Sequence, residues 1–543
     1  MSVNDDDMHT TDFAAWAAST SQRTNRSLAG ARLVSPMSAD DAADDAVRFA
    51  AAAAQWGMIA APAAPAADEG ASDDDCSIRF PSAREDADFD ARRLDGEAAI
   101  DYAQAHMPVL RDLLAHLREH GVADADDAGD TDGMDVTPVD LTGVRIAVCL
   151  VLEPKTAVLL RALHAAGAMV GVFADPSETD QRVADRLRRE GIVVEADVRW
   201  SAEDAHRGAL RLLDAIRPQI IIDDGGSFAR LAAQERPGLL ADLIGVAEET
   251  TSGVRAFEAM RAAGALTFPV VAVNDSVLKT GFDNLHGTGE TCVTTMQALL
   301  GAHAFDDARV AVVGYGPVGR GFAVRVRALG AHVVVCDTDP VAALKAVFDG
   351  FEARDLADAA MWADMVVSAT GVRHTVTLEH MRRMREGAAL AVIGGIANEI
   401  ALDDVPGFTH VTGRDRTDVA VPDGPTLTLL AEGDGVNYTA GGGNPIEIMD
   451  LSFAVQASAV AYLLAHRGRL AAGVHRLPAS CDRMIARVAL RARGMSASHA
   501  IGDNGYSWRL TRFADTVGRS SDDRPSTQPA DQPTTTDPRG AHA

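Results

Sequence analysis

The stretch Arg309–Asp339, RVAVVGYGPVGRGFAVRVRALGAHVVVCDTD, decides how this chain folds. Val310–Val313 is a short apolar run, rich in β-branched residues, of the kind that forms a buried parallel strand. A glycine-rich turn and a helix-like pattern follow, and a second apolar run, Val333–Val335, ends near Asp337. The stretch therefore predicts a strand, a glycine turn, a helix and a second strand closed by an acid.

The three glycines of the turn have the spacing G-x-G-x-x-G. Gly314 allows the tight turn, Gly316 lets the backbone approach a pyrophosphate, and Gly319 lets the helix pack closely on the strand. Pro317 and Val318 begin the helix, whose free amides favour a negatively charged phosphate. A glycine turn alone is weak evidence, but here every element that the motif requires occurs in order.

Asp337 stands at the distance from the glycines where a carboxylate binds the adenosine ribose of NAD. No arginine follows it to bind a 2′-phosphate, and Asp339 would repel one. The sequence therefore predicts NAD as the cofactor and disfavours NADP.

The composition of the 543-residue chain excludes several kinds of partner. Its formal charge of −28 disfavours nucleic acids and anionic membranes. The five cysteines form no C-x-x-C pair, so neither a metal site nor a disulfide framework is indicated. The first residues, MSVNDDDMHTTDF, are acidic where a signal peptide is basic and apolar, and no apolar run reaches transmembrane length. We expect a cytoplasmic protein that acts on a small molecule.

The body of the chain alternates strands with helices, which predicts an α/β fold of two domains with doubly wound parallel sheets. The expected strands are 145–150, 169–173, 192–196, 220–222 and 270–273, and the expected helices are 99–120, 155–166, 181–190 and 445–466. The predicted parts are a disordered acidic and Ala-rich extension (1–91, with a possible helix around 42–56), a substrate domain (92–288, completed by 440–495), a Rossmann NAD domain (289–439), and a divergent, mostly disordered tail (496–543).

Polar side chains follow the predicted strands of the first domain, where ligands of open α/β sheets bind. Asp223–Asp224 follow one strand, Asn274–Asp275 follow another, and Glu248–Glu249 precede a Thr-Thr-Ser run. Lys279 and Asp283 are four residues apart, so a helix would place them on one face. Each feature alone has a simpler explanation, such as a capped turn or a solvated ion pair. Together they indicate a site.

At these residues the chain resembles the S-adenosylhomocysteine hydrolase family, from about Asp101 to about Leu477. The matching segments are MP at Met107–Pro108, CLVLEPKTAVL at Cys149–Leu159, DDGG at Asp223–Gly226, EETTSG at Glu248–Gly253, VNDSVLKTGFDNLHG at Val273–Gly287, GYGPVGRG, the DTDP turn, SATG at Ser368–Gly371, and LLAEGDGVN at Leu429–Asn437. So many matches in order identify the chain as a member of that family.

The resemblance implies a homo-oligomer, a dimer or tetramer, with tightly bound NAD. Family chemistry oxidises a ribose hydroxyl, removes the acidified neighbouring proton, expels a thiol, adds water and reduces the ketone again. By position, Lys279 takes the carbinol proton, Asp283 binds substrate hydroxyls, and Asp224 and Glu249 support acid–base transfer. The implied cofactor set is Thr250, Thr251, Ser252, Asn284, Gly314, Gly316, Pro317, Val318, Gly319, Asp337, Thr370, Ile393, Gly394 and Asn437. The implied substrate set is Glu153, Lys155, Thr156 and Asn444.

The chain departs from the family pattern mainly where the substrate binds. A family histidine is replaced by Val151, and a threonine and a glutamate become Glu153 and Lys155. Two further histidines become Gly395 and Asn444. Other departures are Ser227 for the acid closing DDGGD, PIEIMDLSF for the phenylalanine-bearing helix, and GDNGYSWRLTR at Gly502–Arg512 for the lysine- and tyrosine-rich C-terminus.

The retained redox residues and the altered substrate residues suggest an active enzyme with a changed substrate. Glu153 and Glu447 near the ligand suit a cation, and Lys155 suits a carboxylate. We therefore hypothesise NAD-assisted elimination and hydration of a non-nucleoside hydroxylated sulfur or sulfonium compound, a lyase or hydratase type of reaction. The alternatives are a divergent adenosylhomocysteine hydrolase and an inactive, NAD-sensing regulatory subunit. The alternative interpretation of the charges is that they are simply solvated.

Overall fold

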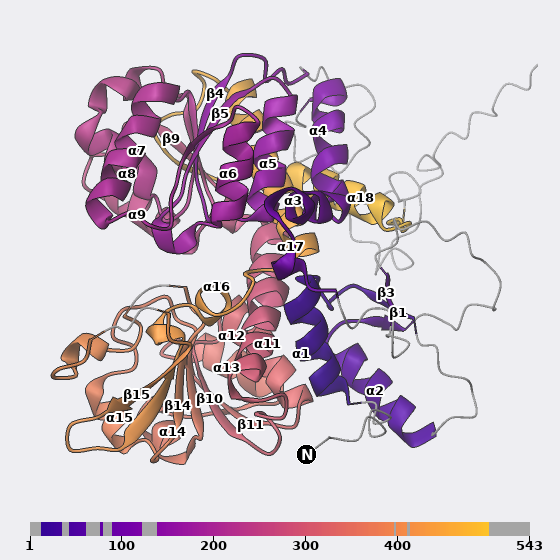
Figure 1. The fold of residues 1–543 in the computed structure, drawn as a ribbon, viewed down its shortest axis with the longest axis vertical. Helices are drawn as coiled ribbons and strands as arrows, with labels where there is room; N and C mark the ends of the chain where they lie inside the picture. Colours follow the sequence, from indigo (N-terminus) through magenta and orange to yellow (C-terminus); the bar gives the residue numbers. More distant parts are fainter. Residues whose placement is uncertain are drawn as a thin grey trace, which may run out of the picture. The chain divides into compact units, whose positions relative to one another are not determined.

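The computed structural model describes residues 12–34, 43–60, 77–79, 89–121, 138–395, 398–409 and 413–498 (Figure 1). The described residues up to Met495 belong to one compact unit, the first of two. The first unit contains two seven-stranded sheets and one three-stranded sheet among its described residues. The predicted α/β class with two doubly wound, mostly parallel sheets is confirmed. Of the predicted tail, only residues 496–498 are described.

The first large sheet is parallel throughout, in the order β17-β9-β8-β7-β4-β5-β6. Its strands are β4 Arg145–Cys149, β5 Met169–Phe173, β6 Val193–Glu195, β7 Ile220–Asp223, β8 Gly245–Glu248, β9 Pro269–Ala272 and β17 Gly473–His475. Its helices are α5 Pro154–Ala165, α6 Gln181–Arg189, α7 Ala202–Ile216, α8 Ser227–Glu235 and α9 Thr251–Ala262, with 3-10 turns η2 Pro176–Glu178 and η3 Pro237–Ala241. The chain starts in the middle at β4, so the strand order reverses between β4 and β7, which is where ligands bind in such sheets.

The second large sheet has the order β12-β11-β10-β13-β14-β16-β15 and is parallel except for the β15–β16 pair. Its strands are β10 Arg309–Val313, β11 His332–Cys336, β12 Glu352–Ala353, β13 Met365–Ser368, β14 Ala389–Val392, β15 Arg416–Ala420 and β16 Thr426–Leu430. Its helices are α12 Pro317–Ala328, α13 Pro340–Phe348, α14 Leu356–Trp362, α15 Leu378–Arg383 and α16 Val436–Thr439, with turns η6 Leu402–Asp404 and η7 Ala431–Gly433. This strand order reverses between β10 and β13, at the glycine turn.

The predicted division into a substrate domain and a NAD domain stays a prediction. Each large sheet nevertheless draws its strands from one of the predicted ranges, and β17 returns to the first sheet from the range 440–495. The helix predicted over 99–120 is two helices, α3 Gly96–Ala105 and α4 Pro108–His120, preceded by the turn η1 Ala91–Arg93. Pro108 separates them because proline has no amide hydrogen and starts a helix better than it continues one.

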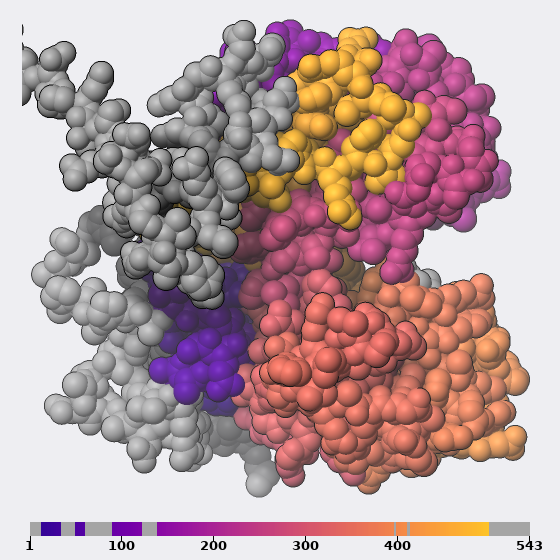
Figure 2. All heavy atoms as spheres, turned by 180° about the vertical axis from the view of Figure 1, so that it is seen from behind, coloured from indigo at the N-terminus to yellow at the C-terminus, as the bar shows by residue number. Residues whose placement is uncertain are grey.

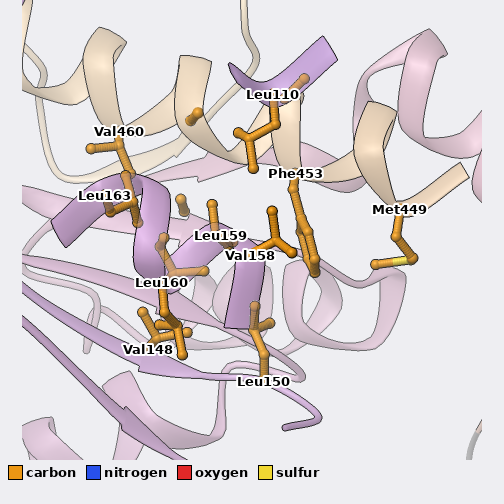
Figure 3. Packing of buried hydrophobic residues seen from close by; sticks show 14 of the residues in the cluster. Leu110, Val148, Leu150, Val158, Leu159, Leu160, Leu163, Met449, Phe453 and Val460 are labelled. Carbon is orange, nitrogen blue, oxygen red and sulfur yellow. The ribbon is translucent and has the colours of Figure 1, made fainter. Parts of the chain in front are cut away.

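The helix α17 Ile446–Ala465 forms the centre of the first core, together with α18 Ala479–Ala492. Phe453 and Val460 of α17 point towards Leu159 and Leu163 of α5 (Figure 3). Contrary to the sequence-based expectation, α17 is long and apolar enough to cross a membrane, but 83% of its apolar window is buried inside the protein. Buried Asp450 of this helix also accepts hydrogen bonds from the amides of Val109 (2.8 Å) and Leu110 (2.7 Å) at the start of α4. These contacts identify α17 as a core helix.

A continuous segment joins the two large sheets. It begins with η4 Val273–Asp275 and α10 Val277–Lys279, continues as the π-helix η5 Thr280–Thr288, and ends as α11 Gly289–Leu300. A side chain at Gly321 of α12 would lie 2.0 Å from the carbonyl oxygen of Leu285. The backbones of α12 and η5 therefore touch, so the helix after the glycine turn fixes the segment that carries Lys279 and Asp283.

The described part of the N-terminal extension is folded, which corrects the prediction of disorder for residues 1–91. It contains α1 Phe13–Thr24, β1 Arg32–Val34, α2 Ala43–Gln55, β2 Ile59–Ala60 and β3 Ser77–Arg79, and the three strands form the small parallel sheet. Phe13, Leu28 and Trp56 are buried in one core with Val293 of α11 and Phe322 of α12. The composition suggested disorder because alanine and aspartate dominate, but a few large apolar residues supply the core contact.

The N-terminal helices lie against the centre of the unit. In the space-filling view, the indigo surface of this segment adjoins the pink surface that includes α11 (Figure 2). The hydroxyl of Ser21 in α1 is 3.1 Å from that of Thr294 in α11, and Gln22 donates to Thr295 over 3.2 Å. The extension is therefore part of the compact unit.

Candidate active site

The reversal of strand order in the first sheet brings three predicted site segments together. The segment Val151–Thr156 follows β4 and begins α5, and the turn Asp223–Gly226 follows β7. The neighbouring β8 ends in Glu248, and Glu249 follows it. Because the carboxyl ends of parallel strands meet at one edge, these segments share that edge of the sheet.

Two of the acids in these segments have structural partners. Asp223 is fully buried and accepts hydrogen bonds from the amides of Phe228 (3.0 Å) and Ala229 (2.8 Å), which start α8. Glu248, also fully buried, accepts from the amides of Gly225, Gly226 and Thr250 over 2.9–3.0 Å. These carboxylates hold the two turns in shape. For Asp223 this is the capped turn that was the simpler explanation of the sequence.

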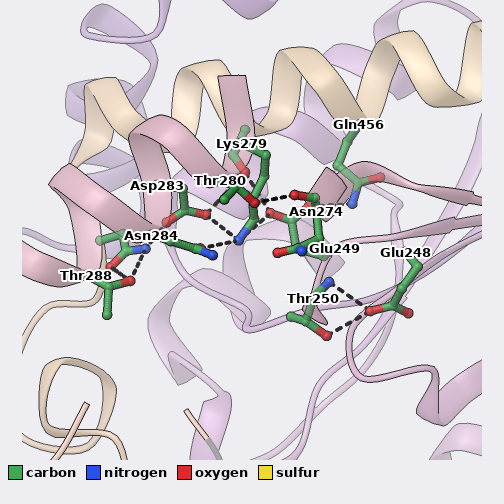
Figure 4. A network of polar contacts seen from close by, with 12 residues as sticks. Glu248, Glu249, Thr250, Asn274, Lys279, Thr280, Asp283, Asn284, Thr288 and Gln456 are labelled. Carbon is green, nitrogen blue, oxygen red and sulfur yellow. Dashed lines mark hydrogen bonds and ion pairs between the residues drawn. The ribbon is translucent and has the colours of Figure 1, made fainter. Parts of the chain in front are cut away.

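Lys279 is the centre of a buried polar group that the sequence predicted only in part (Figure 4). Its ammonium nitrogen lies 2.8 Å from Asp283 Oδ2, 3.1 Å from Asn284 Oδ1 and 3.8 Å from Glu249 Oε1. The lysine is 6% exposed and Asp283 is 3% exposed. The pair was predicted on an α-helix, but Lys279 ends α10 and Asp283 belongs to the π-helix η5. The π-helix is a rare conformation that often marks a functional site.

Glu249 is a carboxylate of this group whose pKa burial shifts strongly upwards. Burial raises the pKa of Glu249 to about 7, and the nearby Asp283 adds to the effect, whereas Lys279 opposes it. Ser452 donates to Oε1 over 2.6 Å, and the Gln456 amide donates to Oε2. Both donors come from α17, so the core helix orients this carboxyl group.

The charges around Lys279 decide which form it takes. Burial alone lowers the pKa of Lys279, but the carboxylates of Asp283 and Glu249 outweigh burial and hold that pKa above its ordinary value. Burial raises the pKa of Asp224, which Lys279 and a hydrogen bond with Thr250 oppose. The four predicted catalytic residues thus influence one another electrostatically, and the lysine holds a proton in this state.

Two buried oxygen atoms beside this group lack hydrogen-bond partners in the described structure. They are Oδ1 of Asn274, which follows β9, and Oε1 of Gln456. Buried polar atoms without partners are rare because each costs about 1–3 kcal/mol. An unpaired polar atom at such a place suits contact with a polar ligand.

The predicted substrate residues Glu153 and Lys155 are paired with each other and with the protein. Their charged groups are 2.9 Å apart, and Lys155 also donates to Asn25 Oδ1 (3.2 Å), Gly442 O (3.1 Å) and Asn444 O (2.7 Å). The prediction that Lys155 meets a substrate carboxylate is therefore wrong in this structure, because protein oxygens already accept its hydrogens.

The expected cation site also lacks a free carboxylate. Glu447 lies 2.5 Å from Arg26 Nε and accepts the Ser27 amide over 3.0 Å. Burial raises the pKa of Glu447, but Arg26 and these hydrogen bonds more than compensate, so the net pKa is lowered. Glu447 thus already has a cationic partner, as Glu153 has in Lys155.

Thr156, another predicted substrate residue, donates to the Val151 carbonyl over 2.6 Å and shapes the start of α5.

Asn444 connects the predicted substrate residues to the lysine group. Its side-chain nitrogen donates to Asp283 Oδ1, and its side-chain oxygen accepts from Asn437 Nδ2 over 2.9 Å. Asn444 is 1% exposed. In this structure Asn444 therefore positions Asp283, whose other oxygen faces Lys279.

The glycine turn fits the pyrophosphate of a dinucleotide. A side chain at Gly316 would meet no atom within 4 Å, so the space beside this residue is open. A side chain at Gly319 would lie 2.0 Å from the carbonyl oxygen of Gly314, and Gly314 has a φ of 95°. The three glycines thus match their predicted roles: Gly314 makes the tight turn, Gly316 leaves space for the pyrophosphate, and Gly319 allows close packing.

The acid at the end of β11 also suits NAD. Asp337 accepts the amide hydrogens of Tyr315 (2.7 Å) and Asp339 (2.8 Å), one on each carboxylate oxygen. Each oxygen can accept a further hydrogen bond from a ribose hydroxyl. Pro317 stands in the first turn of α12, and Val318 follows it. These residues fit the cofactor that the sequence predicts.

Further residues of the predicted cofactor set gather around the buried Glu399. Thr370 donates its amide (3.0 Å) and its hydroxyl (3.0 Å) to Glu399 Oε2, and Ser368 donates to the same oxygen over 2.6 Å. A side chain at Gly394 would lie 2.1 Å from this glutamate, and Ile393 at the end of β14 is 1% exposed. Glu399, which sequence reasoning missed, therefore holds the two loops beside the glycine turn.

The remaining predicted cofactor residues lie near the lysine group. Thr250 caps α9, and the exposed Thr251 and Ser252 follow it. Asn284 accepts from Lys279, and Asn437 donates to Asn444. Their contacts with NAD stay predictions.

The structure adds Tyr438 of α16 to the site. Its side chain is 46% exposed, and it interacts electrostatically with the carboxylates of Asp283, Glu153, Asp224 and Glu249. An exposed aromatic ring within the influence of these site carboxylates can contact a ligand. Nothing in the sequence distinguished this tyrosine, since no motif marks its position.

Comparison with known proteins agrees with this geometry. Residues 294–443 match the family model for the S-adenosyl-L-homocysteine hydrolase NAD binding domain. The chain is 40% identical over 408 residues to an adenosylhomocysteinase of Thermococcus kodakarensis (74% of this chain, 91% of the relative) and 39% identical over 408 residues to that of Pyrococcus abyssi (74% and 92%). It is 36% identical over 405 residues to an S-inosyl-L-homocysteine hydrolase of Methanopyrus kandleri (74% and 91%). The predicted family and the predicted cofactor, NAD, are confirmed, and the chain belongs to the adenosylhomocysteinase family of NAD-dependent hydrolases.

Proposed function

We propose that this enzyme cleaves a hydroxylated thioether by transient oxidation of a secondary alcohol, loss of the sulfur group, addition of water and reduction. The buried contact of Lys279 with Asp283, Asn284 and Glu249 is the observation that carries this proposal. Bound NAD supplies the hydride acceptor and later the hydride donor. The residues of the chain supply the proton transfers.

Lys279 and Glu249 divide those proton transfers in this proposal. Lys279 holds a proton in the structure, so it acts as a base on the carbinol hydroxyl only after that proton has moved. Glu249 Oε1, 3.8 Å from the ammonium, belongs to a group whose pKa is about 7, so it exchanges protons at neutral pH. Asp283 keeps the ammonium in place and accepts a substrate hydroxyl, and Asp224 assists at the acidified C–H bond.

The first candidate substrate is a homocysteine thioether of a ribonucleoside. The chain is similar both to an adenosylhomocysteinase and to an S-inosyl-L-homocysteine hydrolase. Because two relatives are named for different nucleosides, this class of substrate is supported without fixing the base. Val151 and Gly395 stand where the family resemblance expects histidines, and the accessible Tyr438 ring offers an apolar surface instead. We infer a nucleoside whose base is held with fewer polar contacts than adenine receives in the family.

The second candidate is the non-nucleoside hydroxylated sulfur compound that the sequence suggested. The loss of histidines supports it, since a site that lacks hydrogen-bonding groups no longer selects for a polar base. Its cationic form, a sulfonium, has lost its main support because Glu153 and Glu447 are paired with Lys155 and Arg26.

The experiment offers S-adenosylhomocysteine, S-inosylhomocysteine and hydroxylated thioether and sulfonium acids to the NAD-loaded enzyme in deuterated water. NMR follows deuterium incorporation beside the carbinol, and a thiol reagent follows the leaving group. Exchange and thiol release with a nucleoside support the first candidate, and exchange with the acids alone supports the second. No exchange and no NAD reduction with any compound would overturn the proposal and favour the regulatory alternative.

Association with further copies of the chain is a separate proposal that rests on the family resemblance. The exposed residues Val341, Leu344, Val347 and Phe348 of α13 give it an apolar face, with Phe348 85% exposed. Such a face is what self-association buries. Light scattering on the purified protein decides between a monomer, a dimer and a tetramer.

A further inference from the structure

The described N-terminal segment, residues 12–34 and 43–60, contacts the residues that surround the lysine group. Consecutive residues 25–29 reach two places, the glycine loop 441–445 with the start of α17, and the start of α11. What these contacts do for catalysis rests on the function proposed above.

Asn25 binds both ends of the glycine loop. Its side-chain nitrogen donates to the Gly442 carbonyl, and its backbone carbonyl accepts the Ile446 amide over 2.9 Å. Its side-chain oxygen accepts from Lys155 over 3.2 Å. A side chain at Gly442 would lie 2.5 Å from Asn25 Nδ2, so the glycine is needed for this close approach. Asn25 itself has a φ of 51°, a left-handed conformation that asparagine tolerates better than most residues.

Residues 26–29 form a second anchor through two buried carboxylates. Arg26 and the Ser27 amide bind Glu447 at the first turn of α17. The amides of Leu28 (2.8 Å) and Ala29 (3.2 Å) bind Glu290 at the first turn of α11. Glu290 is fully buried and lies 3.6 Å from Arg325 of α12. The segment therefore ties α17 to α11 through charges that have little contact with water.

A continuous chain of hydrogen bonds leads from Asn25 to the lysine group. Asn25 and Lys155 hold the backbone of the glycine loop at Gly442 and Asn444. The Asn444 side chain donates to Asp283, and Asp283 is paired with Lys279 over 2.8 Å. A shift of the loop therefore changes where Asp283 and Lys279 stand relative to a substrate.

We propose that the N-terminal segment is a built-in clamp that positions Asp283 and Lys279 through the glycine loop, with Asn25 as its principal positioning residue. Lys155 and Asn444 serve this clamp and do not contact substrate directly.

The test compares Asn25→Gly, Asn25→Asp and Arg217→Gly in the full-length, NAD-loaded protein. Glycine accepts the left-handed backbone of Asn25, so only the side-chain contacts are lost. Aspartate keeps an acceptor for Lys155 but removes the donor to Gly442. Arg217 is the matched control, because it also follows a helix in the left-handed conformation, with a φ of 49°, and it is exposed.

We expect Asn25→Gly to lower kcat by roughly 10- to 100-fold with little change in KM, as small displacements of catalytic groups do. Asn25→Asp should lie between this variant and the wild type, and Arg217→Gly should equal the wild type. Hydrogen exchange read by mass spectrometry should be faster in Asn25→Gly for the peptides that cover 441–446 and 280–288.

The two measurements separate this proposal from the proposed function. An unchanged kcat in Asn25→Gly on an active enzyme overturns the clamp, whether or not the loop exchanges faster. If the wild type turns over none of the substrates, the proposed function fails. The clamp is then tested by the hydrogen-exchange measurement alone. In that case faster exchange in both peptides supports it, and faster exchange in neither or in the loop alone overturns it.

Discussion

At the scale of single residues, burial changes the meaning of the pair Lys279–Asp283. On a solvated helix this pair would contribute about 0.3–0.5 kcal/mol. In the structure both residues are buried, with Asn284 and Glu249 beside them, so the alternative of a solvated surface pair is wrong. A buried lysine among carboxylates has its protonation set by them, which is what a proton-transfer group needs.

We predict that Lys279→Met lowers the rate at which substrate reduces the bound NAD by about 10²–10⁴, because a general base is lost. Absorbance of reduced NAD after rapid mixing measures this rate. The control is Lys345→Met, since Lys345 of α13 is exposed and has no part in the group. Retention of NAD by the Lys279 variant shows that it is folded, and a near wild-type rate in that variant contradicts the role.

The pKa of Glu249 predicts a pH-dependent effect on stability. Below pH 4.5 the carboxyl group is protonated in both the folded and the unfolded chain, and between pH 4.5 and about 7 only the unfolded chain loses the proton. Stability contributed by the protonated form is therefore lost as pH rises through 7. Glu249→Gln should be more stable than the wild type at pH 8, by on the order of 1–3 kcal/mol, and less active.

Urea unfolding of both proteins at pH 5 and pH 8 measures this difference. The gain should be small at pH 5 and larger at pH 8. The same variant should also lose a transition near pH 7 from the pH profile of kcat/KM. A stability difference that does not depend on pH would contradict the assignment of this pKa to Glu249.

At the scale of elements, two glycines in the turn between β10 and α12 are expected to have different roles, one in cofactor binding and one in folding. Gly319 packs against the Gly314 carbonyl, whereas the position beside Gly316 is open. Both glycines belong to one sequence motif, yet only one of them is needed for the backbone to close. Gly316 also has an ordinary φ of −71°, so an alanine there introduces no backbone strain.

We therefore predict that Gly316→Ala and Gly319→Ala differ. Gly316→Ala should leave the Tm without NAD nearly unchanged but reduce the increase in Tm that added NAD gives, since bound ligand stabilises in proportion to its affinity. Gly319→Ala should lower the Tm even without NAD, because its new methyl group meets backbone. Thermal unfolding with and without NAD measures both, and equal behaviour of the two variants would contradict the separate roles.

At the scale of the whole molecule, one unit combines two seven-stranded sheets and the described N-terminal segment. The connection through η5 is tight, because Gly289 and Gly321 bring α11 and α12 into backbone contact. The predicted ribose-binding end of the NAD site carries two acids, Asp337 and Asp339. Two acids there repel a 2′-phosphate.

We predict that the purified protein, once denatured, releases NAD and no NADP. Mass spectrometry of the supernatant identifies the nucleotide, and protein denatured after reconstitution with an equal mixture of the two provides the control. Recovery of NADP from that mixture would contradict the electrostatic reason given for Asp337 and Asp339.

The sequence by itself determined the features that are local in the chain. The strand, glycine turn and helix of Arg309–Asp339, the alternation of strands and helices, and the acids at the strand ends all depend on neighbouring residues. The spacing of apolar residues predicts these features, because backbone conformation and the burial of one face depend on about ten neighbouring residues. The same short stretch predicted NAD as the cofactor, through its glycine turn and Asp337. The family resemblance added that the NAD is tightly bound.

Only the tertiary structure decided which charges are available to a ligand. Glu153, Lys155 and Glu447 looked like substrate contacts, but Lys155 and Glu447 bind Asn25 and Arg26 from more than a hundred residues away. The extension looked disordered because its composition is dominated by alanine and aspartate, and its few large apolar residues became informative only when α11 and α12 covered them. Pairing and burial between distant segments leave no periodic pattern in the sequence, so the partners of a charged side chain are known only once the chain has folded.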